Sequence, residues 1–191
     1  MDAMMRKYPL ISQRKNVISS AFEAVSTDEA AISMIDNELH SNVTLKWIKA
    51  QLIDIFVFCG AFEAINDMQV IMIARHIREK YYYLTPTELT YFFEQFASGA
   101  YGMLFVGKTI NPQIILQAMR QCENTLINQR AEIQAHKEEE ERKQEELRLM
   151  REGKLGIKGW AIYCQKKGIN NQTLPMQDFL KEMQKKKFNV K

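Results

Sequence analysis

The sequence has few of the residues that interrupt helices, with four prolines and eight glycines among 191 residues. It also has no apolar run long enough to span a bilayer, because the most apolar stretch, LIDIFVFCGAF at 52–62, is short and contains Asp54. The first 15 residues lack the apolar segment of a secretory signal peptide. These absences predict a cytoplasmic protein of long helices, without a membrane span.

Cysteine and histidine are scarce as well, with three of each. They lie far apart, so they provide neither a disulfide framework nor the close spacing of a metal site. No nucleophile pattern joins a histidine to a cysteine or serine. Asp54 interrupts an apolar stretch, which places it at the polar edge of a helix. We therefore expect a non-enzymatic protein with no catalytic residues, no metal and no cofactor.

The charge is unevenly distributed along the chain. The net charge is +3, yet residues 154–191 contain nine lysines and only two acidic residues, a net +7. Residues 1–153 therefore carry −4. This asymmetry predicts an appended basic segment with a role of its own.

Apolar residues recur every three or four positions in several stretches, which is the spacing of one helix face. Helices are expected at 30–39, 42–60, 67–80 and 86–97. Ser26 and Glu29 have the spacing of a capping box before the first of these, and Thr85, Pro86 and Glu88 form a strong start for the last. The inward residues of the last two helices are expected to be Val70, Ile73, Ala74 and Ile77, then Leu89, Phe92, Phe93 and Phe96.

Asn111 and Pro112 start a fifth helix that no glycine or proline interrupts before Gly153. Beyond Ile133 nearly all of its residues are charged, so we expect this part to be a solvated helix projecting from the core. Sustained apolar heptads are absent, which argues against a long coiled coil. Short self-association into a small homo-oligomer remains an alternative. Its apolar face is expected to be Ile115, Met119, Cys122 and Leu126.

The expected fold is all-α, with a multi-helix core and a short hairpin-like clip between helices. The expected organisation is an N-terminal arm at 1–26, a helical core at 27–133, a charged helix extension at 134–153 and a small basic C-terminal helical segment at 154–191. We interpret the arm as loosely packed because its residues show no firm period.

One stretch, GMLFVGKT at 102–109, fits the phosphate-loop pattern G-x-x-x-x-G-K-[ST]. A working phosphate loop joins a buried parallel strand to a helix that begins at the lysine and threonine. Here the variable positions are bulky and apolar, the strongest helix start is Asn111-Pro112, and the chain lacks βαβ alternation. We expect an extended clip with an exposed Lys108, and an NTPase remains a remote alternative.

Residues 68–130 also show a tyrosine-rich helix end, an acidic-aromatic helix, a glycine-x-tyrosine-glycine turn and an Asn-Pro helix start. With these motifs the stretch resembles an uncharacterised family of mostly helical proteins from phages and mobile elements of gut anaerobic bacteria. Val106-Gly107 stands where that family commonly has Tyr-Gly, and Asn111 replaces the usual acid. The resemblance implies a mobile-element setting, and the family offers no known activity to carry over to this chain. The matching positions are Tyr82, Leu84, Thr85, Phe92, Phe93, Gly99, Tyr101, Gly102, Gly107, Asn111, Pro112 and Arg130.

Two functional hypotheses follow. The first is an accessory protein, linked to replication, that binds single-stranded or duplex DNA weakly and without sequence preference, because lysines attract phosphates and aromatic rings stack on bases. The second is an adaptor or structural protein that contacts only protein partners through its amphipathic basic helices. The residues expected to contact nucleic acid or a partner are Arg75, Arg78, Lys80, Lys108, Lys154, Lys158, Trp160, Tyr163, Lys166, Lys167, Lys185, Lys186 and Lys187.

Overall fold

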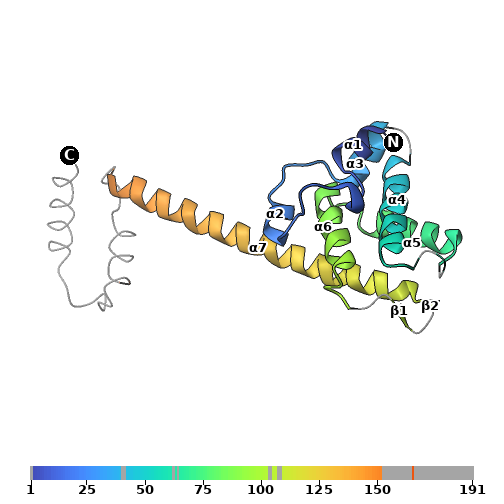
Figure 1. Ribbon diagram of the computed structural model, residues 1–191. Coiled ribbons are helices and arrows are strands. Elements are labelled where there is room, and N and C mark those ends of the chain that lie inside the picture. The colour runs from blue at the N-terminus through green and yellow to red at the C-terminus, as the bar shows by residue number, and fades with distance from the viewer. Residues whose placement is uncertain are drawn as a thin grey trace. The chain divides into compact units, whose positions relative to one another are not determined.

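The computed structural model describes residues 2–39, 42–61, 63, 65–102, 105–106, 109–151 and 165 (Figure 1). The chain divides into two compact units, Met1–Glu132 and Ile133–Lys191. The fold is all-α, as the sequence predicts. In chain order the elements are α1 (Asp2–Lys7), η1 (Ile11–Gln13), α2 (Ala21–Val25), α3 (Ile32–Leu39), α4 (Val43–Phe58), α5 (Asp67–Lys80), α6 (Pro86–Ala97), β1 (Phe105–Val106), β2 (Thr109–Ile110) and α7 (Pro112–Arg151).

Helix α4 is the centre of the first unit. It packs against α1, η1, α3, α5 and α6. Trp47 on α4 is fully buried, and its ring lies 6.1 Å from Tyr8 and 5.9 Å from Phe93. These edge-to-face contacts join the N-terminal segment, α4 and α6 in one aromatic core.

The helix faces agree with the predicted periodicity. Each of the four residues expected to face inward on α5 and each of the four on α6 is buried. The face predicted for the start of α7 is buried too, from Ile115 to Leu126. The spacing of apolar residues along a helix follows from the helix repeat alone, so the sequence was sufficient to locate these buried faces.

The starts of α5 and α6 use the same device. In α6, Thr85 accepts a hydrogen bond from the backbone N–H of Glu88, whose side chain accepts one from the Thr85 N–H. Asn66 and Gln69 form the equivalent capping box at α5. Each box satisfies two N–H groups that a helix start leaves without partners, which fixes where the helix begins.

The capping box predicted at Ser26 and Glu29 is wrong. Ser26 ends α2 instead, and its hydroxyl donates to the Phe22 carbonyl at 2.6 Å. The Glu29 carboxylate accepts a hydrogen bond from Thr87 at 2.6 Å and pairs with Lys7 at 3.4 Å. The Glu29 side chain therefore contacts α1 and α6, whereas local spacing predicted that it would cap a helix.

The loose packing predicted for residues 1–26 is also wrong. Met4, Tyr8, Ala21 and Ala24 belong to the hydrophobic core. The carbonyl of Tyr8 accepts the Trp47 indole N–H at 2.9 Å. The segment lacks a clear period because it is made of short helices and extended chain, which are held by contacts with the rest of the fold.

The chain between α6 and α7 forms the predicted hairpin-like clip. Strands β1 and β2 pair antiparallel, with Val106 opposite Thr109. Before them, Gly99 and Gly102 have φ angles of +81° and +94°, which only glycine adopts without strain. Tyr101 packs on the core against Phe92, with ring centroids 6.1 Å apart.

The long helix α7 contains 40 residues. No described side chain after Ile133 is buried. Lys143 pairs with Glu139 at 2.9 Å and with Glu140 at 3.5 Å, and these contacts support an isolated helical segment modestly. The helical segment predicted at 154–191 lies outside the described residues apart from Gln165. Among the described helices, none is both long and apolar enough to cross a membrane.

Candidate nucleic-acid interface

The predicted contact residues of α5 do not converge on one surface. Arg75 and Lys80 are five positions apart, so they lie about 140° apart around the helix axis. Both are exposed. Only Lys80 lies at the helix end, where its ammonium is 5.2 Å from the centre of the Tyr81 ring.

Arg78 is engaged in an internal contact. Its Nε donates to Asp36 at 2.6 Å, and the same carboxylate accepts hydrogen bonds from the backbone N–H and the hydroxyl of Thr44. The Asp36 side chain is 8% exposed. This cluster joins α3, α4 and α5, so we interpret Arg78 as a structural residue.

The three consecutive tyrosines divide into one core residue and two surface residues. Tyr81 is buried, whereas Tyr82 is 57% and Tyr83 is 37% exposed. The Tyr82 and Tyr83 rings meet edge to face with centroids 5.6 Å apart. The structure thus places a pair of aromatic rings at the surface between α5 and α6.

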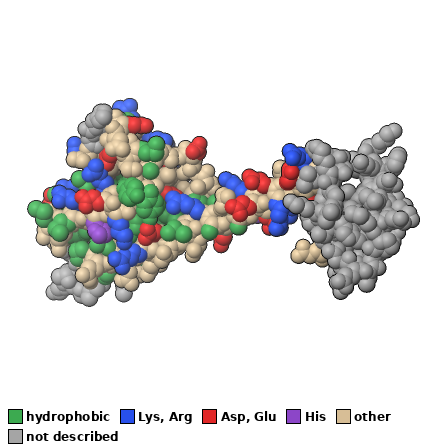
Figure 2. Space-filling view, turned by 180° about the vertical axis from the view of Figure 1, so that it is seen from behind, with side chains coloured by type: hydrophobic (Ala, Val, Ile, Leu, Met, Phe, Trp, Pro, Cys, Tyr) green, Lys and Arg blue, Asp and Glu red, His purple; other side chains and the backbone are tan. Residues whose placement is uncertain are grey.

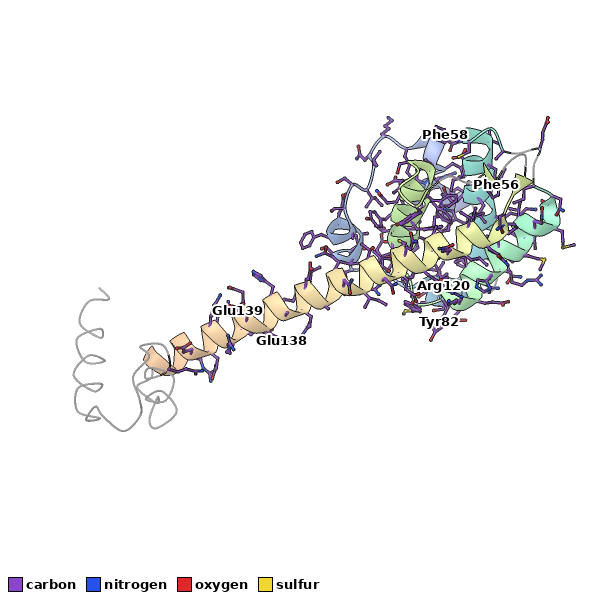
Figure 3. All side chains as sticks on the ribbon, turned by 90° about the horizontal axis from the view of Figure 1, so that it is seen from below. Phe56, Phe58, Tyr82, Arg120, Glu138 and Glu139 are labelled. Atoms are coloured by element: carbon purple, nitrogen blue, oxygen red, sulfur yellow. The ribbon has the colours of Figure 1, made fainter. Side chains whose placement is uncertain are left out.

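A cation from α7 lies near Tyr81, the residue that precedes this pair. Arg120 is exposed, and it is close enough to Tyr81 for its charge to lower the pKa of that phenol, although burial raises the pKa overall. Figure 3 labels Tyr82 and Arg120. We call the set Lys80, Tyr82, Tyr83 and Arg120 the tyrosine surface.

Tyr83 is held in place by a carboxylate. Its hydroxyl donates to Glu123 on α7. Burial, followed by this hydrogen bond, raises the pKa of Tyr83 well above its usual value. The tyrosine surface combines two aromatic faces and two cations with the Glu123 carboxylate at its edge, and the rings and cations are a chemistry suited to unpaired bases and phosphates.

The remaining predicted contacts cannot be added to this surface. Lys108 and the nine positions from Lys154 to Lys187 all lie outside the described residues. Around Lys108, the described part of GMLFVGKT forms an antiparallel strand pair, with Thr109 in β2. The following helix begins at Pro112, whereas the helix of a phosphate loop begins at the lysine and threonine.

A second concentration of basic residues was missed in the sequence. A pocket of about 540 Å³ is lined by four cations, Arg6, Lys7, Arg14 and Lys15, together with residues of α6 and a single acid, Glu29. A signal was available, since residues 3–22 contain these four basic residues and no acidic one. We call this feature the basic pocket. Its wall depends on contacts between distant positions, which spacing does not reveal.

Comparisons with protein-family models, with curated proteins and with solved structures find no match to this chain. The functional argument therefore depends on the chemistry of these two surfaces.

Proposed function

We propose that the protein is a non-enzymatic accessory protein of a phage or mobile element, which contacts single-stranded nucleic acid weakly and without sequence preference. The observation that carries the proposal is the exposed Tyr82–Tyr83 ring pair, which follows Tyr81 in the chain; Lys80 and Arg120 lie near Tyr81. Every base has a face that can stack on such rings, so aromatic contacts tolerate any sequence. Lysine and arginine side chains supply attraction to phosphates.

The charge distribution supports the same proposal. The lysines of residues 154–191 give that segment a net +7, which adds sequence-independent attraction to a nucleic-acid backbone. Residues 1–153 carry −4, so this part of the chain attracts a nucleic-acid backbone less than residues 154–191 do. We expect binding to weaken steeply as salt is raised. A cytoplasmic location and a role linked to replication belong to this proposal.

The test is fluorescence anisotropy of a labelled single-stranded oligonucleotide with full-length protein at low salt. Replacing Tyr82 by alanine should weaken binding by roughly fivefold or more, because one stacked base is lost. Phe22 is the matched control, since it is 56% exposed and lies on α2. Phe22→Ala should leave the affinity unchanged. Equal affinities of wild type and Tyr82→Ala would contradict the proposal.

A protein-only adaptor is the second candidate, and one observation favours it. Met68 and Met72 follow each other by one turn on α5 and are 65% and 62% exposed. Figure 2 shows hydrophobic side chains at the surface of this unit among charged ones. Flexible methionines suit contact with a partner helix. Loss of a nuclease-resistant copurifying protein on Met72→Glu, with no oligonucleotide binding by wild type, would favour this candidate.

A further inference from the structure

The basic pocket has a rigid wall, which is the first requirement of a binding site. The wall between α1 and α2 is held by buried Arg14, whose side chain is 7% exposed. Its guanidinium donates to the carbonyl of Pro9, to Glu94 and to the hydroxyl of Thr90, each at 2.9 Å. The backbone N–H of Ile18 donates to the same Glu94 at 2.6 Å. These contacts fix the segment before any ligand arrives, which reduces the entropy lost on binding.

Arg14 also retains unused donors. A guanidinium has five N–H groups, and three of them make the contacts just described. Two N–H groups thus remain without a hydrogen bond to the described residues, on a buried cation that lines the pocket. Such a group is suited to binding an oxyanion, because planar guanidinium donors match the oxygens of phosphate.

The residues that line the pocket carry an excess of positive charge, with four cations and one acid, Glu29. Behind the pocket, Glu94 pairs with Arg14, on which Asp54 also acts, and Glu29 pairs with Lys7 at 3.4 Å. Within the described part of the chain, Arg6 and Lys15 have no acidic partner. A phosphate monoester carries about −1.5 to −2 at neutral pH, so these cations attract it.

The first turns of α6 add favourable electrostatics. Thr87 and Thr90 line the pocket, and α6 begins one residue before Thr87. The positive end of the helix dipole is therefore at the pocket, where it stabilises an anion. The volume of about 540 Å³ exceeds a phosphate group and is typical of sites for small organic ligands.

We propose that the basic pocket binds a terminal phosphate monoester, with Arg6, Arg14 and Lys15 contacting the phosphate and with Tyr8, Pro9 and Ile18 bordering the organic part. This site is separate from the tyrosine surface and does not depend on the proposed function. The monoester is either a free nucleotide-sized molecule or the 5′-phosphate at the end of a nucleic-acid strand, since both present the same group.

The experiment is isothermal titration calorimetry of the full-length protein with adenosine 5′-monophosphate and with adenosine. Binding of the phosphorylated probe only is expected. The double variant Arg6→Gln, Lys15→Gln should weaken it by roughly tenfold or more, because two charge-assisted contacts are lost. The control Lys46→Gln, Lys137→Gln removes the same charge at exposed positions that do not line the pocket and should leave binding unchanged.

A pair of oligonucleotides, with and without a 5′-phosphate, identifies the source of the group. Tighter binding of the phosphorylated strand assigns the site to a strand end, and binding of the monophosphate with no difference between the strands assigns it to a free ligand. Absence of binding by both phosphate probes would overturn the proposal. Equal binding of adenosine, or equal weakening by the control variant, would also overturn it. Far-UV circular dichroism checks that both double variants are folded.

Discussion

At the residue scale, two buried carboxylates hold α6 to the segments on its two sides. Glu94 pairs with Arg14 of the N-terminal segment, and Glu88 pairs with Arg130 of α7. The Glu88 and Glu94 side chains are 2% and 5% exposed. Buried charges are tolerated only when they are paired and hydrogen-bonded. Removing one partner leaves the other charge buried and unpaired, which lowers the stability of the fold strongly.

Replacing Glu94 by glutamine should therefore destabilise the protein strongly. Arg14 would stay buried without the counter-charge of Glu94. Burial disfavours the charged guanidinium, which is why it lowers the pKa of Arg14. We expect a loss of about 3 kcal/mol or more in the free energy of unfolding, measured by urea denaturation at neutral pH.

The control for this substitution is Glu139→Gln on α7. Glu139 pairs with Lys143 in an exposed ion pair, and such pairs contribute little to stability. We expect no measurable change in the urea midpoint for this variant. A Glu94→Gln protein as stable as the control would show that the buried pair is not a major contributor to folding.

At the element scale, the two capping boxes define where α5 and α6 begin. Replacing Thr85 by alanine should lower the free energy of unfolding by about 1 kcal/mol, because the backbone N–H of Glu88 loses its acceptor. Thermal unfolding followed by circular dichroism measures the effect. Thr125 provides the matched control, since it is exposed within α7 and its hydroxyl donates to the Gln121 carbonyl. A Thr85→Ala protein that unfolds like Thr125→Ala would contradict the role of the cap.

The same elements show how far the sequence could be read. Helices α4 to α7 have apolar faces several turns long, so their periods predict both their existence and their buried sides. The short helices α1 and α2 contain six and five residues, too few to show a period or to be stable alone. Their positions depend on Tyr8, Arg14 and other residues that contact distant helices.

The candidate sites follow the same rule. The three tyrosines and the basic residues near them are adjacent in sequence, so the sequence could locate this surface. It could not predict that Tyr81 is buried or that Arg78 pairs with Asp36. Arg120 was missed because it reaches the surface from α7. The basic pocket brings α6 residues next to a segment about 80 positions earlier, a juxtaposition that no local spacing indicates.

At the scale of the whole molecule, the unit Met1–Glu132 contains the entire hydrophobic core of the described residues. No described side chain after Ile133 is buried. A fragment of residues 1–132 should therefore fold alone, with a melting temperature within about 5 °C of the full chain. Calorimetry of both proteins checks this, and a fragment without a cooperative transition would contradict the division into units.

The contact between Arg14 and Glu94 has a consequence for synthesis. The two residues are separated by 80 positions, so Arg14 leaves the ribosome long before its counter-charge has been made. Contacts between such distant positions form slowly, and this one cannot form before α6, which carries Glu94, has been made. The segment that carries Arg14 is thus translated before α6, the helix that holds it in place. The proposed anion pocket therefore cannot form in a nascent chain until α6, which supplies Thr87 and Thr90, has emerged.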